Sequence, residues 1–131
     1  MKVLFVCRAN VGRSQAATAL YNQIHPGNSD SVGTIVDNPG EKLVDRKGAK
    51  NIIEVMFEHD IDITSNRRTQ INENRINQYD KVIVMAEQKT IPDWLRDNSK
   101  TEVWTIQDPK DQDIETTRKI VREIEEKVKS L

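Results

Sequence analysis

The feature that most constrains the fold is a short apolar strand that passes directly into a helix at the start of the chain. Residues 3–6 are continuously apolar, which is typical of a strand buried on both faces of a parallel sheet. Residues 14–24 then carry apolar side chains at helical spacing, and Pro26 with Gly27 ends the predicted helix. A buried strand followed at once by a helix favours an α/β fold.

The same alternation continues to the end of the chain. Further strands are expected at residues 31–36, 82–86 and 102–106. Further helices are expected at residues 49–57, 72–78, 93–97 and 114–131, and a charged loop at residues 37–48. Strands that alternate with helices predict an α/β fold with a four-stranded parallel sheet and helices on both faces. We expect residues 1–131 to form one such domain.

The segment after the first strand is the expected binding site, because parallel sheets bind ligands beyond the carboxyl ends of their strands. It reads Cys7, Arg8, Ala9, Asn10, Val11, Gly12, Arg13, Ser14. A loop between a strand and a helix directs backbone N–H groups and a helix N-terminus at one point, which makes an anion site. The Gly-Lys-Ser/Thr ending of a nucleotide-binding P-loop is missing, so the segment predicts a different kind of phosphate-binding loop.

The residue types in this segment suit nucleophilic attack on phosphorus. Loop amides and the helix dipole stabilise a thiolate at Cys7, and Ser14 can donate a hydrogen bond to it. If the loop curls, Arg13 returns to its rim and can hold two phosphate oxygens. Asn10 tolerates the left-handed backbone that a tight loop needs. A cysteine at the end of a core strand can also be simple packing, and it is the combination of residues that favours a catalytic site.

The order of motifs resembles the low-molecular-weight protein tyrosine phosphatases and the related thioredoxin-coupled arsenate reductases. Cys7-x-x-Asn10-x-x-Arg13-Ser14 resembles their catalytic loop. The other matching stretches are Ser31-Val32-Gly33-Thr34, residues 60–64 followed by Arg67, residues 79–85, and Asp108-Pro109. The resemblance implies a phosphomonoester phosphatase, in the first place for protein phosphotyrosine, that works through a phosphocysteine intermediate without a metal or other cofactor.

The resemblance also assigns roles outside the loop. Asp108 aligns with the general acid of the family, and it follows the last predicted strand at the same sheet edge as Cys7. Asp111 is the alternative acid, and either Asp111 or Asp113 is expected to cap the last helix. Ser31 is expected to support the loop. Arg67 and Arg68 are interpreted as a solvated turn, with contact to a phosphorylated partner as the alternative.

Departures from the family pattern bear on the substrate. Ala9, Gly12 and Gln15 replace the common Gly, Cys and Pro of the loop, and Asn66 replaces a His. Lys110 stands where tyrosine phosphatases commonly carry an aromatic residue after Asp-Pro. The Arg-Ser-Gln ending is more typical of arsenate reductases, but those enzymes use two further cysteines that this chain lacks.

Composition excludes several function classes and leaves two alternatives to the phosphatase. The formal net charge of -1 removes the usual signature of a nucleic-acid binder, and no apolar segment suggests a membrane or a signal peptide, so a cytoplasmic location is expected. His25 and His59 are expected at helix ends rather than in a metal site. The expected partner is a phosphorylated protein or a small phosphate ester, with inorganic phosphate as product. The alternatives are an arsenate reductase that uses an external small thiol and a phosphate-binding regulatory protein without turnover.

Overall fold

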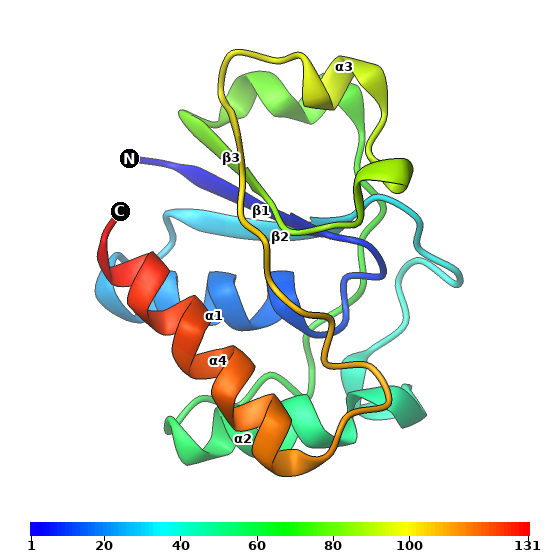
Figure 1. The fold of residues 1–131 in the computed structure, drawn as a ribbon, viewed down its shortest axis with the longest axis vertical. Coiled ribbons are helices and arrows are strands. Elements are labelled where there is room, and N and C mark those ends of the chain that lie inside the picture. The colour runs from blue at the N-terminus through cyan, green and yellow to red at the C-terminus, as the bar shows by residue number, and fades with distance from the viewer.

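A parallel sheet of four strands forms the centre of the molecule. The computed structural model describes all residues 1–131. The strands lie in the order β2-β1-β3-β4 and all pairings are parallel (Figure 1). Their bounds are β1 Val3–Cys7, β2 Ser29–Gly33, β3 Lys81–Val84 and β4 Thr101–Val103. This order brings the carboxyl end of β1, and with it Cys7, to the middle of one sheet edge.

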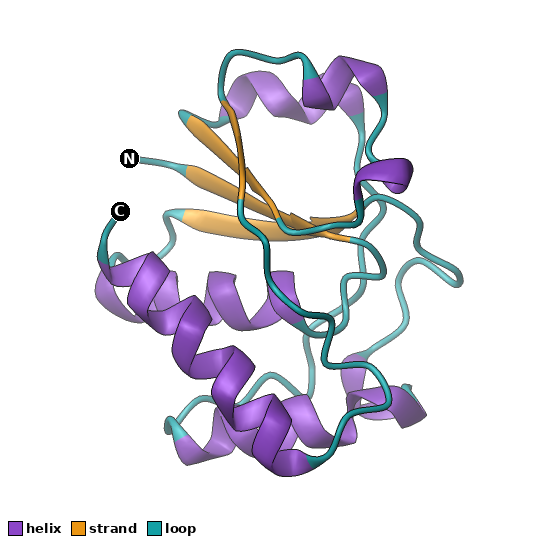
Figure 2. Ribbon diagram, in the orientation of Figure 1, coloured by secondary structure: helices purple, strands orange, loops and turns teal.

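Helices cover both faces of this sheet, which confirms the predicted fold class. The helices are α1 Arg13–Ile24, α2 Lys50–Glu58, α3 Asp93–Arg96 and α4 Ile114–Lys129. Helices α1, α2 and α4 lie on one side of the sheet, and α3 lies on the other (Figures 1 and 2). Four 3₁₀ turns lie in the connections, at Leu43–Asp45, Lys47–Ala49, Glu73–Gln78 and Gln88–Thr90. No helix is both long and apolar enough to span a bilayer.

Strand β1 is buried on both faces, which explains its unbroken apolar sequence. Val3, Phe5 and Cys7 join the hydrophobic cluster that packs beneath α1 and α4. Leu4 and Val6 point the other way, into the cluster on the α3 side. Side chains of successive strand residues alternate between faces, so a strand between two helical layers needs apolar residues at every position. Packing in the two core clusters therefore holds β1, the strand that ends at the candidate site, in place.

Three residues that were expected at helix ends are found there. The carboxylate of Asp113 accepts a hydrogen bond from the backbone N–H of Thr116, so Asp113, and not Asp111, is the N-cap of α4. His25 and His59 are the C-cap residues of α1 and α2, as expected. No three His, Cys, Asp or Glu side chains are grouped as metal ligands would be.

Two strands end three residues earlier than the sequence pattern suggests, and both deviations build the site. The strand expected at residues 31–36 ends at Gly33, because the next two N–H groups donate to the carbonyls of Cys7 and Arg8 and wrap around the loop. The strand expected at residues 102–106 ends at Val103, and the chain then leaves the sheet toward Arg13.

The remaining differences are smaller. The strand expected at residues 82–86 lies at Lys81–Val84. On α2, Val55 is buried and Phe57, expected on the buried face, is 49% exposed. Of the last turn of this helix, Val55 and Met56 lie in the core and Phe57 does not.

Candidate active site

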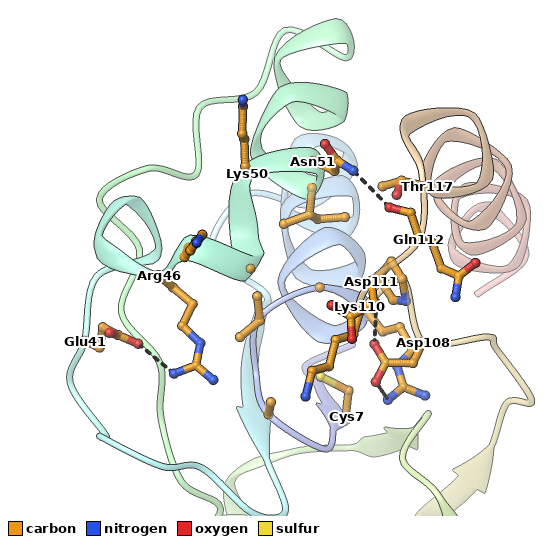
Figure 3. Close-up of a pocket in the computed structure, with 18 of the residues that line it drawn as sticks. Cys7, Glu41, Arg46, Lys50, Asn51, Asp108, Lys110, Asp111, Gln112 and Thr117 are labelled. Atoms are coloured by element: carbon orange, nitrogen blue, oxygen red, sulfur yellow. Dashed lines mark hydrogen bonds and ion pairs between the residues drawn. The ribbon is translucent and has the colours of Figure 1, made fainter.

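One cleft of about 640 Å³ opens over the end of β1. The loop contributes Cys7, Ala9, Val11, Gly12 and Arg13 to its lining. Asp108 and Lys110 lie beside Cys7, and Glu41 and Arg46 form the opposite wall (Figure 3). The structure therefore brings together the nucleophile, the arginine and the acid that the sequence analysis singled out.

The carbonyl groups of the loop are held on its outer side. The carbonyls of Cys7 and Arg8 accept hydrogen bonds from backbone N–H groups just after β2. The carbonyl of Ala9 accepts two from Arg68, and that of Asn10 accepts one from the Gln15 side chain. These bonds orient the peptide planes, because the two ends of a planar peptide point in opposite directions.

The backbone N–H groups of the loop have no acceptor within the protein. None of those from Arg8 to Ser14 donates to a backbone or side-chain atom. Buried backbone donors are almost always paired, so a consecutive series of free ones marks a binding site. We call this set of free donors at the start of α1 the cradle, and its chemistry suits an anion.

A buried polar network supports this cradle from behind. The Cys7 thiol and the Ser14 hydroxyl lie 3.0 Å apart. The Asn10 side chain donates to Ser14 at 2.8 Å and to Ser31 at 3.0 Å, and its carbonyl oxygen accepts from Gln15 and from the N–H of Thr69. Asn10 is fully buried and has the left-handed φ of 56° that the sequence analysis expected. Arg8, in contrast, has an exposed side chain.

Arg13 differs in position from the expectation, because its side chain is buried instead of lying at the rim. Only 4% of the side chain is exposed. Its Nη1 donates to the carbonyls of Met85, at 2.5 Å, and Ile106, at 3.1 Å. These carbonyls follow β3 and β4, so the two strand ends aim the guanidinium. Nη1 is fully occupied, and Nε has no protein acceptor.

Two carboxylates approach Nη2 of Arg13. Glu87 Oε1 lies at 3.1 Å and Asp108 Oδ2 at 3.5 Å. The other oxygen of Glu87 is buried without a hydrogen-bond partner. The sequence analysis did not find Glu87, although its place just after β3, at the same sheet edge as Cys7, was a usable signal.

The segment that carries Asp108 packs directly on the phosphate loop. A Cβ added at Gly12 would lie 2.7 Å from Cγ of Pro109, so the glycine permits this close approach. The Asp108 Oδ1 accepts a hydrogen bond from the N–H of Lys110 at 3.0 Å, which fixes the turn. Pro109 and Gly12 thereby hold the carboxylate of Asp108 beside the loop. Asp111 also lines the cleft, on the exposed side of this turn.

Arg68 overturns the interpretation of residues 67 and 68 as a solvated turn. Its residue is 1% exposed, and its guanidinium binds Ala9, Asp37 and Glu41. Arg67 is exposed and donates to the carbonyl of Gly40. Two adjacent arginines in a polar segment carry no periodic signal, so the sequence alone did not separate the buried one from the exposed one.

The hydrogen bond from Arg68, and then that from Arg46, lowers the pKa of Asp37 from 3.8 to about 2. Stability from this carboxylate is therefore present above its unfolded pKa and is lost as the pH falls from about 4 to about 2. We expect Asp37→Asn to flatten this part of the acid-denaturation profile. Melting temperatures of the wild type and of Asp37→Asn, measured between pH 2 and 7, test this. Parallel profiles over the acid range would show that Asp37 does not contribute.

The walls of the cleft carry charges and no aromatic ring. The basic lining residues outside the loop are Arg46, Lys47, Lys50 and Lys110, and the acidic ones are Glu41, Asp45, Asp108 and Asp111. Arg46 is paired with Asp37 and Glu41, whereas Lys47, Lys50 and Lys110 form no ion pair. The mouth of the site thus offers free ammonium groups in place of a stacking surface.

Comparison with known proteins gives a consistent match. Residues 2–131 match the profile of the family described as low molecular weight phosphotyrosine protein phosphatase. A probable low molecular weight protein-tyrosine-phosphatase, EpsP of Ralstonia solanacearum, is 32% identical over 87 residues. That match covers 64% of this chain and 54%, or about half, of the relative's length.

Solved structures share the fold at lower sequence identity. Vibrio vulnificus Wzb in complex with benzylphosphonate has a TM-score of 0.81 at 23% identity, over 98% of this chain and 94% of that chain. The YwlE arginine phosphatase from Geobacillus stearothermophilus has a TM-score of 0.79 at 23% identity, over 98% and 88% of the two chains.

Proposed function

Because the chain belongs to the low molecular weight phosphotyrosine protein phosphatase family, we propose that it hydrolyses phosphomonoesters, in the first place phosphotyrosine in proteins, through a phosphocysteine intermediate. The observation that carries the proposal is the series of free N–H groups from Arg8 to Ser14 around the Cys7 thiol. A ring of donors of this kind suits the three equatorial oxygens of a phosphoryl group in transfer. The curated relative EpsP, a probable protein-tyrosine-phosphatase, supports the same substrate class.

In the first step, the Cys7 thiolate attacks phosphorus and the bond to the ester oxygen breaks. The loop N–H groups and Nε of Arg13, which has no acceptor in the protein, stabilise the phosphoryl oxygens, and Asp108 gives its proton to the leaving oxygen. The Ser14 hydroxyl, 3.0 Å from the sulfur, supports the thiolate.

In the second step, water attacks phosphorus and the sulfur–phosphorus bond breaks. The Asp108 carboxylate takes a proton from this water, and the products are inorganic phosphate and the Cys7 thiolate. Each group returns to its starting state, and the scheme uses only groups of the loop, Arg13, Asp108 and water. Because a lone thiol nucleophile needs reducing conditions, we further propose that the protein works in the cytoplasm.

The proposal is tested by release of inorganic phosphate in the presence of a chelator. Substrates should include phosphotyrosine and phosphoserine peptides, phosphoarginine and an aryl phosphate. Hydrolysis of the aryl phosphate with phosphotyrosine peptides as the best peptide substrates would support it. Binding of phosphate without turnover would instead indicate a regulatory protein, and hydrolysis of phosphoarginine alone would reassign the substrate.

Because Lys110 replaces an aromatic residue at the mouth of the cleft, we expect weaker binding of phosphotyrosine than in a family member that has the aromatic residue. A ring stack contributes roughly 0.5–1.5 kcal/mol beyond area burial, so Lys110→Tyr should lower the KM for phosphotyrosine peptides by up to about tenfold. The wild-type enzyme should favour peptides with acidic residues beside the phosphate, and that preference should fall as salt rises. Steady-state kinetics on acidic and neutral peptides at two salt concentrations check both effects. An unchanged KM with no effect of peptide charge would show that Lys110 does not border the bound substrate.

A further inference from the structure

Arg68 has more hydrogen-bond partners than a residue that only fills space requires. Its side chain has no exposed surface, and every nitrogen of the guanidinium donates to an oxygen. Nε and Nη2 donate to the Ala9 carbonyl at 3.1 and 3.0 Å. Nη1 and Nη2 donate to the carbonyl and carboxylate of Asp37 at 2.8 and 2.7 Å, and Nη1 also donates to Glu41 at 2.9 Å.

The part of this arrangement that matters for the site is the pair of bonds to Ala9. Two N–H groups of one rigid guanidinium converge on a single carbonyl oxygen, which fixes its direction more firmly than one bond does. That carbonyl shares a planar peptide with the N–H of Asn10. When Arg68 holds the Ala9 carbonyl on the outer side, the Asn10 N–H must face the opposite side, toward the cradle.

The position of Asn10 makes this support necessary. Its φ of 56° lies in the left-handed region, which costs energy for a residue with a side chain. The neighbouring carbonyls of Cys7 and Arg8 are held by backbone N–H groups after β2. The next carbonyl, that of Ala9, accepts no hydrogen bond from a backbone N–H. The Arg68 side chain, from a distant part of the chain, supplies the donors instead.

We propose that Arg68 is a positioning residue of the phosphate loop, which turns the Ala9–Asn10 peptide so that the Asn10 N–H binds the phosphate. The inference rests on the proposed function. Arg68 does not line the cleft and touches no reacting atom, so it acts only through the loop. Its acidic partners Asp37 and Glu41 are also partners of Arg46, which lines the cleft, so one cluster ties the loop to the opposite wall.

The test measures binding of inorganic phosphate by calorimetry to the full-length wild type and to Arg68→Met and Arg68→Lys. We expect Arg68→Met to bind phosphate roughly tenfold to a hundredfold more weakly, as for loss of one oriented hydrogen bond to a charged group. Arg68→Lys should lie between the two, because an ammonium group can bind the Ala9 carbonyl at one point only. This second variant keeps the test decisive if Arg68→Met does not fold.

Two control variants separate positioning from general stability. Arg67→Met removes the adjacent arginine, which holds Gly40 but not the phosphate loop. Asp37→Asn weakens the other side of the Arg68 cluster and leaves the bonds to Ala9, and Asp37 does not line the cleft. Both should lower the melting temperature while phosphate affinity stays within about twofold of wild type.

Nuclear magnetic resonance gives a readout that a purely structural role would not change. Addition of phosphate to wild type should shift the amide signal of Asn10, and Arg68→Lys should reduce that shift more than the shift of Gly12. Unchanged phosphate affinity in a folded Arg68 variant, or an unchanged Asn10 shift, would overturn the inference. Failure of the wild type itself to bind phosphate would overturn the proposed function, and the inference with it.

Discussion

Replacing Cys7 by serine is expected to abolish turnover while phosphate binding persists. The substitution removes the thiol nucleophile and puts in its place a hydroxyl, which is a much weaker nucleophile because it stays protonated. The amides from Arg8 to Ser14 and the Arg13 guanidinium remain, so the anion site is intact. Phosphate release on an aryl phosphate and calorimetry with inorganic phosphate measure the two properties separately.

A matched control shows whether loss of activity comes from the sulfur. Ser14→Ala removes the group 3.0 Å from the sulfur but keeps the nucleophile, so it should retain part of the turnover. Near-normal turnover in Cys7→Ser would exclude attack by this residue. If Cys7→Ser lost both phosphate binding and turnover, the substitution would instead have disturbed the loop.

Asp108→Asn is expected to lower kcat by about 10²–10⁴-fold for a substrate with a poor leaving group, the usual contribution of a general acid. The amide can still accept the hydrogen bond from the N–H of Lys110, so the turn should keep its shape. The defect should shrink for a leaving group that departs without a proton. A leaving-group series under saturating substrate measures this dependence.

Asp111→Asn is the control, because Asp111 lies on the same turn and lines the same cleft. It should leave the dependence on the leaving group unchanged. Equal losses for good and poor leaving groups in Asp108→Asn would assign a structural role to Asp108. A leaving-group effect that appears in Asp111→Asn instead would move the acid to that residue.

The phosphate loop could be predicted because its parts are contiguous in the sequence. A buried strand, a cysteine and a helix start within a few residues define both the place of the loop and its direction of curvature. The left-handed Asn10 and the Cys7–Ser14 contact followed from residue type and spacing alone. Asp108 could be located at the correct sheet edge, since it comes just after the last strand.

The supporting contacts could not be predicted, because they come from distant parts of the chain. Arg68 reaches Ala9 across 59 positions, and Glu87 reaches Arg13 across 74. The residues next to Arg68 and Glu87 in the sequence do not distinguish these two from charged residues on the surface. The strand ends were misjudged for a related reason: the residues after Gly33 look like strand, but their N–H groups bind the loop instead of continuing the ladder.

The most direct test of the central claim is a search for the phosphocysteine intermediate. Wild-type enzyme is mixed with substrate, quenched in acid within the first turnovers and analysed by peptide mass spectrometry. We expect one phosphoryl group on the peptide that contains Cys7. In Asp108→Asn, the yield of this peptide should be higher if the intermediate breaks down more slowly than it forms. Phosphate on another residue, or rapid turnover with no phosphate on Cys7, would contradict the mechanism.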